Sequence, residues 1–229
     1  MNVTIGERKT YDDWGLLLQS LVISMPEAKI SQVDIPGADG MIDLTEAMGS
    51  VKYNNRELQM IFDFQGDPAG WHSLTSKIAD YLHGKRLKII LDSDPNYYYI
   101  GRLSLNSEKS NYLINRVTIT GDMDPYKYEL LSSLEDWLWD SFDFETGVIR
   151  EYKDLVVDGS LTVEIPGTRK EVLPTFTASA AMEVEWRGIR YDLPVGVTKI
   201  YAISIPEGDH ELIFYGNGVV SIDYRGGIL

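Results

Sequence analysis

From Asp154 to the C-terminus, the sequence consists of short runs rich in β-branched and aromatic residues, with glycine or proline after about every ten residues. The runs are DLVVDG, SLTVEIPG, TFTASA, AMEVEWRG, IRYDLPVG, VTKIYAISIPEG, DHELIFYGNG and VVSIDYRGG. In the last run, Val220, Ile222 and Tyr224 alternate with polar residues, which is typical of a strand with one buried face. The pattern requires no helix and predicts an antiparallel β-sandwich or jelly roll over residues 151–229.

The first half of the chain also contains strand patterns, at 30–35, 52–64, 86–91, 97–105 and 112–121. In the second of these, Leu58, Met60 and Phe62 share one face. One helix is predicted at about 68–83, because Asp67 is a good N-cap, Pro68 suits the first helical position and Gly84 suits a left-handed stop. The fold class is therefore mainly β: an N-terminal mixed β domain with one helix over 1–128, a connector over 129–150, and the C-terminal sandwich.

Charge and composition exclude several classes of protein. The chain has 21 basic and 35 acidic residues, a net charge of −14, and no cysteine. Disulfides, thiol catalysis and cysteine-ligated metals are thus excluded, and an acidic chain is unsuited to binding the nucleic-acid backbone. No apolar run is long enough for a membrane span, and the N-terminus lacks a signal-peptide core. We expect no sequence-specific nucleic-acid partner, no membrane partner, and synthesis in a cytoplasm.

Sequence motifs for catalysis are absent. The chain has no G-x-S-x-G, G-x-x-x-x-G-K-[ST] or H-E-x-x-H motif, and its histidines are His72, His83 and His210. His83 suits the C-terminal end of the predicted helix. Carboxylates are abundant, so a glycosidase-like pair stays open on residue type alone. The prediction is a protein that is not an enzyme, with no catalytic residues and no cofactor.

Two acidic stretches resemble cation sites but are better explained as turns. Asp92 and Asp94 lie in LDSDPNYYY, where Asp, Pro and Asn favour a turn. The stretch DIPGADGMIDLTE holds Asp34, Asp39 and Asp43 without the spacing of a calcium loop, so it is predicted to be a glycine-rich turn between strands. No metal site is expected.

The second half is rich in aromatic residues that could bind sugar rings. They are Trp186, Tyr191, Tyr201, Tyr215 and Tyr224. The alternative is that they pack in the core and at the edges of the sandwich, since aromatic residues favour strands in any case. Trp186, Tyr191 and Tyr215 are the candidates for a glycan-binding platform.

Several strings in residues 10–128 resemble the N-terminal domain of siphophage distal tail proteins from phages and prophages of Gram-positive bacteria. They are TYDDWGLLL, PEAK, VDIPGADGMIDLTE, YNNRELQMIFDF, LHGKRLKIILDSDPNYYYIGR and DPYKY, in that order. Each string is weak alone, and their combination is more specific. The C-terminal part resembles the family only in architecture, as a variable galectin-like or carbohydrate-module-like sandwich.

The resemblance implies a structural protein of the phage tail tip. Six copies would form a ring at the distal end of the tail tube, with the major tail tube protein and the tail-tip hub or tail-associated lysin protein as partners. The C-terminal sandwiches would contact a receptor-binding protein or a host cell-wall glycan. The resemblance also implies that the protein assembles in the bacterial cytoplasm and is finally located at the tip of the virion's tail. The alternative is a carbohydrate-binding protein that acts through the C-terminal sandwich.

Some positions match the family strings: Asp34, Gly37, Gly40, Arg56, Gly84, Lys85 and Arg102. The glycines are predicted to serve turns or caps. Arg56 and Arg102 are predicted to pair with carboxylates in the same domain. These positions are as consistent with maintaining the fold as with contacting a partner.

Overall fold

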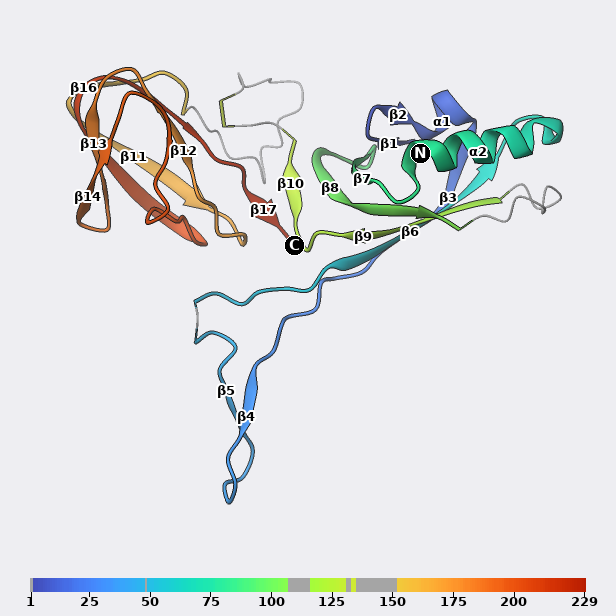
Figure 1. Ribbon diagram of the computed structural model, residues 1–229, viewed down its shortest axis with the longest axis horizontal. Coiled ribbons are helices and arrows are strands. Elements are labelled where there is room, and N and C mark those ends of the chain that lie inside the picture. The colour runs from blue at the N-terminus through green and yellow to red at the C-terminus, as the bar shows by residue number, and fades with distance from the viewer. Residues whose placement is uncertain (1, 48, 107–115, 131–132, 135–151) are drawn as a thin grey trace. The chain divides into compact units, whose positions relative to one another are not determined.

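The computed structural model describes residues 2–47, 49–106, 116–130, 133–134 and 152–229 (Figure 1). The chain divides into two compact units, Met1–Lys127 with Leu229, and Tyr128–Ile228. Most of the predicted connector, 129–150, lies outside the described residues. The short strand β10 (Lys127–Glu129) crosses the unit boundary, and β17 (Gly227–Ile228) lies at the end of the second unit.

The first unit is built on an antiparallel sheet with the strand order β2-β1-β7-β8-β9-β6-β3. Its strands are β1 (Val3–Ile5), β2 (Arg8–Lys9), β3 (Leu16–Ile23), β6 (Arg56–Phe64), β7 (Arg86–Leu91), β8 (Asp94–Leu105) and β9 (Arg116–Met123). The predicted alternation in β6 is confirmed, since Leu58, Met60 and Phe62 are buried while Gln59 is exposed. One face of this sheet therefore forms the core of the unit.

The predicted helix is present as α2 (Trp71–Leu82), which a 3-10 turn, Pro68–Gly70, precedes. Asp67 accepts a hydrogen bond from the backbone N–H of Ala69 at 3.0 Å, so it caps the 3-10 turn rather than α2 itself. Gly84 follows the helix at φ 75°, as a left-handed stop requires. Trp71, Ile78 and Leu82 are fully buried in the same core as β6, and this fixes the helix on the sheet.

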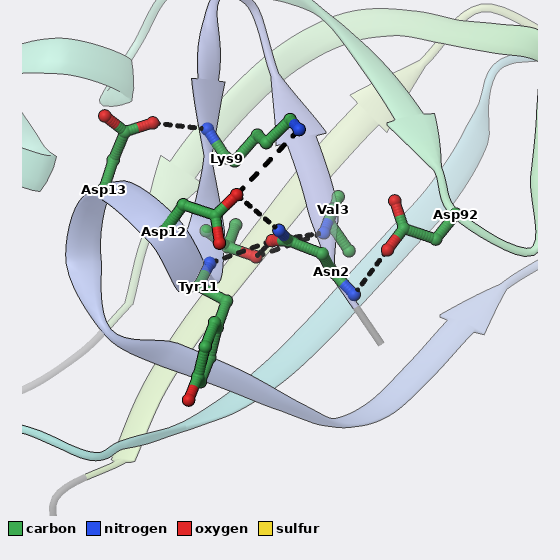
Figure 2. A network of polar contacts seen from close by, with 8 residues as sticks. Asn2, Val3, Lys9, Tyr11, Asp12, Asp13 and Asp92 are labelled. Atoms are coloured by element: carbon green, nitrogen blue, oxygen red, sulfur yellow. Dashed lines mark hydrogen bonds and ion pairs between the residues drawn. The ribbon is translucent and has the colours of Figure 1, made fainter.

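A second, shorter helix that was not predicted, α1 (Thr10–Trp14), lies between β2 and β3. Its N-cap residue Lys9 makes no side-chain cap. Instead, the side-chain oxygen of Asn2 accepts hydrogen bonds from the backbone N–H groups of Val3 and Tyr11, and Asp13 accepts one from Lys9 N–H at 2.7 Å (Figure 2). Asn2, which precedes β1, and Asp13 of the helix itself thus accept hydrogen bonds from the backbone donors of Tyr11 and Lys9 at the start of α1.

The second unit is an antiparallel sheet with the strand order β14-β13-β16-β12-β15, and β11 pairs with β16. The strands are β11 (Leu155–Gly167), β12 (Thr175–Ala178), β13 (Met182–Trp186), β14 (Ile189–Leu193), β15 (Gly196–Lys199) and β16 (Gly208–Asp223). Val220, Ile222 and Tyr224 are buried as the alternation predicted. The mainly β fold class with antiparallel pairing is confirmed.

Two pairs of sequence segments, each predicted as separate strands, are continuous in the structure. DLVVDG and SLTVEIPG form the single strand β11, and DHELIFYGNG continues into VVSIDYR as β16. Gly159 of β11 lies opposite Gly216 of β16, at φ 76° and 138°. The two glycines therefore allow a shared local distortion in a long strand pair, where the sequence alone suggested two turns.

Candidate assembly surface

Residues 24–47 and 49–55, between β3 and β6 in the first unit, form an extended arm (Figure 1). Near its tip, β4 (Gln32–Asp34) and β5 (Met41–Asp43) pair antiparallel, and among the described strands they pair only with each other. Gly37 and Gly40 in the connecting turn have φ 88° and 78°, so the predicted glycine-rich turn between strands is confirmed. A two-stranded hairpin this short is marginal without a further contact.

One face of the arm is aliphatic and exposed. Val33 lies directly opposite Ile42, and the N–H of Leu44 donates to the carbonyl of Ser31, which extends the ladder by one pair. Val33, Ile42 and Leu44 share this face, and their exposed fractions are 46%, 48% and 42%. Complete burial of such a side chain is worth about 1.5–3 kcal/mol. The tip therefore offers an apolar stripe that no described part of its own unit covers.

The opposite face of the hairpin is mostly polar. Gln32 and Asp34 alternate with the aliphatic residues on β4, and Asp43 lies opposite Gln32 on β5. The exposed Met41, opposite Asp34, is the apolar residue of this face. The hydroxyl and the backbone N–H of Thr45 donate hydrogen bonds to Asp43 and hold the pKa of its carboxyl below the ordinary value. The ionised carboxylate thus stabilises the turn that ends β5, and the arm is amphipathic with one face suited to contact.

The root of the arm is fixed to the sheet from both ends. Ser24 and Glu57 exchange hydrogen bonds, from Ser24 N–H to the Glu57 carbonyl at 2.9 Å and from Glu57 N–H to the Ser24 hydroxyl at 2.8 Å. The ring of Tyr53 packs edge-on against that of Tyr126, with 5.9 Å between centroids. The direction in which the arm leaves the sheet is therefore set by local contacts.

Arg56, at the first position of β6, is 3% exposed. Its guanidinium donates to the backbone carbonyl of Pro125 and lies 5.5 Å from the centre of the Tyr99 ring, while its Nε has no hydrogen-bond partner. Burial lowers the pKa of Arg56, and Tyr99 opposes that change. The prediction of a carboxylate partner is wrong, because the buried end of β6 offers a carbonyl and a ring face instead.

The other family-like cations also bond to backbone carbonyls. Arg102 donates to the carbonyl of Gly84, and Lys85 donates to that of Asp80 at 2.8 Å. The predicted carboxylate partner of Arg102 is therefore also corrected. Asp94, weighed above as a cation ligand, pairs with Lys127 at 2.6 Å, and Asp92 accepts from the backbone N–H of Asn2. These residues connect elements of the first unit to one another.

The three candidate glycan-binding residues occupy different environments in the second unit. Trp186 is 5% exposed and belongs to the core, where its ring lies 5.4 Å from His210. Tyr191 is half-buried and packs against the same core. Tyr215 is half-buried under the guanidinium of Arg190, 3.8 Å from its ring centre, and donates to Glu185. They do not form one open aromatic platform, and glycan binding by them stays a prediction.

A groove that sequence reasoning missed lies in the same unit. Its volume is about 860 Å³, and residues from β11, from the turn between β13 and β14, and from the start of β16 line it. Trp186 is in its lining, together with Glu164 and Glu211. No local signal in the sequence marks these two carboxylates, because their juxtaposition depends on the register of two strands that are distant in the chain.

Two further observations concern ions and membranes. Among the described residues, no three side chains of His, Asp or Glu lie close enough together to hold one metal ion. None of the described helices is long and apolar enough to cross a membrane.

Comparison with known proteins identifies a structural neighbour. No family model matches the chain, and no curated protein sequence matches it. The crystal structure of the SPP1 Dit protein (gp 19.1) superposes with a TM-score of 0.63 at 13% sequence identity, covering 100% of this chain and 99% of that one. That protein is described as a paradigm of the hub adsorption apparatus in phages that infect Gram-positive bacteria. The fold of this chain is therefore similar, over its whole length, to that of a protein of a phage hub adsorption apparatus.

Proposed function

We propose that this chain is a structural, non-enzymatic component of a phage tail, in which six copies form a ring at the distal end of the tail tube. The ring joins the tube to the tail-tip hub and the adsorption apparatus. The similarity to the SPP1 Dit fold supports this role, since it extends over both units of the chain. The partners are other copies of the chain, the tail tube protein and the tail-tip hub protein, and the location is the tip of the virion's tail.

The observation that carries the proposal is the exposed aliphatic face of the arm. An isolated hairpin that keeps Val33, Ile42 and Leu44 about half exposed is unfavourable in a monomer and favourable where a neighbouring subunit covers it. Closed rings are built from such heterologous contacts, in which a patch on one copy meets a different patch on the next. The well-anchored root presents the same face in each copy.

The test compares two matched variants of the full chain, Val33→Asp in the arm and Val197→Asp on β15 of the second unit. Both valines are exposed, at 46% and 75%, so both changes introduce the same charge at an accessible site. We expect Val33→Asp to abolish ring formation, seen by light scattering of purified protein and by electron microscopy of tails, while Val197→Asp assembles normally.

If the Val33→Asp variant forms rings at wild-type yield, the arm is not part of the interface between subunits. Absence of the protein from purified tail tips, tested with an antibody label, would overturn the proposed function. A wild-type chain that is monomeric in solution but present at tail tips supports assembly on a partner, so the two measurements are made together.

A further inference from the structure

The outer edge of β3 has room for a further strand. Among the described strands, β3 pairs with β6 alone and ends the sheet of the first unit. The backbone N–H of Ser24 donates to the carbonyl of Glu57 at 2.9 Å, so the backbone groups of Ser24 point toward β6. This direction alternates along an antiparallel strand. The backbone groups of Leu21 and Ile23 therefore point away from β6, toward the open side.

This edge lacks the features that usually prevent strand addition. Residues 16–25, LLLQSLVISM, contain no charged residue and no proline, whereas exposed edges are commonly protected by lysine, by proline or by very short strands. Val22 and Met25 are 54% and 77% exposed. The register shift between Leu18 and Ser20 leaves a regular, uncharged edge from Ser20 onward.

The other sheet edges of the described chain are short or charged. The strand β2, at the opposite end of the first sheet, has two residues, both basic. In the second unit, β14 and β15 have five and four residues, and each includes charged side chains. The long strand β11 carries Asp158, Glu164 and Pro166. The edge of β3 is therefore the one among these that is both long and unprotected.

The hairpin of the arm, in turn, lacks a third strand. Two-stranded hairpins are marginal in water, and three strands with an apolar face are needed for independent stability. The N–H of Leu44 donates inward, to the carbonyl of Ser31 at 2.8 Å. By the same alternation, the backbone groups of Met41 and Asp43 on β5 point outward, away from β4. The outer edge of β5 can thus pair with a strand that belongs to another molecule.

The side chains of the two edges match on both faces. Leu21 and Ile23 lie partly buried at the rim of the core of the first unit, on the core face of the sheet. The apolar stripe of the arm would extend that face and cover them. On the other face, the exposed Met41 of β5 would lie beside the exposed Val22. A strand shifted to the reverse face would bring polar side chains onto the core instead.

Charge along the arm favours contact between the tip of one arm and the base of another. The lysines of the arm lie at its base, where the N–H of Lys29 donates to the carbonyl of Lys52 at 2.8 Å. The acidic residues toward the tip are Asp34, Asp39, Asp43 and Glu46. Because β3 leads directly into the base of the arm, a hairpin bound along β3 lies close to these lysines. Pairing of two tips would instead oppose like charges.

We propose that β5 of one copy adds to the open edge of β3 in the next copy and extends its sheet by the hairpin. The backbone groups of Leu21 and Ile23 pair with those of Met41 and Asp43, and the apolar stripe covers the rim of the core. The contact joins two different surfaces, so its repetition from copy to copy suits a closed ring. This inference rests on the proposed function, since it names the surface that receives the arm.

The first test is cross-linking of the full chain, which has no cysteine of its own. Val22→Cys/Met41→Cys is treated with a short bismaleimide in rings of purified protein or in purified tails, whichever form wild type adopts. We expect covalent multimers on a denaturing gel at a yield at least about tenfold above the control, because the two thiols are held together. The control is Val197→Cys/Met41→Cys, which places the first thiol on the exposed β15 of the second unit.

The second test removes the outward backbone donor of Ile23. Ile23→Pro and Ile23→Ala both lose the side chain, and only the proline variant also loses the N–H that points away from β6. We expect Ile23→Pro to form rings at least about tenfold less well than Ile23→Ala, since each interface loses a hydrogen bond. Thermal melts check that both variants fold, and the cross-linking result stands independently of them.

Two results overturn the inference and leave the proposed function intact. One is a double-cysteine variant that enters rings or tail tips but yields only monomers after cross-linking. The other is equal ring formation by folded Ile23→Pro and Ile23→Ala. A wild-type chain that forms no ring and is absent from tail tips refutes the proposed function, and this inference with it.

Discussion

The side-chain oxygen of Asn2 accepts a hydrogen bond from the backbone N–H of Tyr11 at 2.9 Å, and so the second residue of the chain caps a helix that follows two strands (Figure 2). The same oxygen also accepts from Val3 N–H and from the Thr10 hydroxyl. The backbone N–H of Asn2 donates to Asp92, between β7 and β8. One asparagine therefore joins three segments of the first unit.

Asn2→Ala should lower the free energy of unfolding of the first unit by about 1–2 kcal/mol, the usual cost of losing a capping side chain. Urea denaturation followed by fluorescence measures this. Asn54→Ala is the control, because Asn54 is exposed and its side chain makes no hydrogen bond with a described residue. Equal, small effects of the two changes would show that the Asn2 contacts contribute little.

Asp13 should make stability depend on pH in the acid range. Hydrogen bonds from Lys9 N–H and from the Arg8 side chain hold the pKa of Asp13 below its ordinary value of 3.8. Because the folded-state pKa is below the unfolded one, the stabilisation is complete above about pH 5 and is lost as pH falls through the folded-state pKa. Asp13→Asn should therefore be less stable than wild type at pH 7, with a difference that shrinks toward pH 3.

Denaturation midpoints at a series of pH values provide the measurement for Asp13. Asp39→Asn is the matched change at an exposed residue in the turn of the arm, and it should differ little from wild type at any pH. If the denaturation midpoints of wild type and Asp13→Asn differ by the same amount from pH 7 to pH 3, the prediction is contradicted.

Arg56→Ala should lower the free energy of unfolding by about 2–3 kcal/mol, since it leaves a cavity beside Tyr99 and removes the donor to the Pro125 carbonyl. The matched variant is Arg102→Ala, which also removes a guanidinium bonded to a backbone carbonyl, but at an exposed position. Its cost should be below about 1 kcal/mol. Chemical denaturation measures the loss of stability in both variants. Similar losses would mean that the burial of Arg56 is unimportant for stability.

Gly216→Ala should lower the stability of the second unit by about 2 kcal/mol, because φ is 138° and an added Cβ would lie 2.9 Å from the Cβ of Met182. Gly208→Ala tests the backbone effect alone, since Gly208 has φ 107° and an added Cβ would meet no atom within 4 Å. We expect Gly208→Ala to cost less. Thermal melts of the two variants measure the difference, and the reverse order would show that the contact with Met182 relaxes freely.

The sequence by itself determined the elements that depend on neighbouring residues. Alternation placed Leu58, Met60 and Phe62 on a buried face, and Gly84 marked the end of α2. The glycine-rich turn of the arm also followed from local preference. These features were predictable because side-chain periodicity and backbone conformation are set within a few residues.

Only the tertiary structure decided which distant residues meet. Gly159 and Gly216 were interpreted as turns, but their pairing across β11 and β16 makes them parts of continuous strands. The same register sets Glu164 against Glu211, and the fold gives Arg56 a carbonyl and a ring where a carboxylate was expected. Pairing between distant strands depends on the whole core, since shifting a strand by one residue moves all its side chains to the other face. That global constraint leaves no local trace in the sequence around these residues.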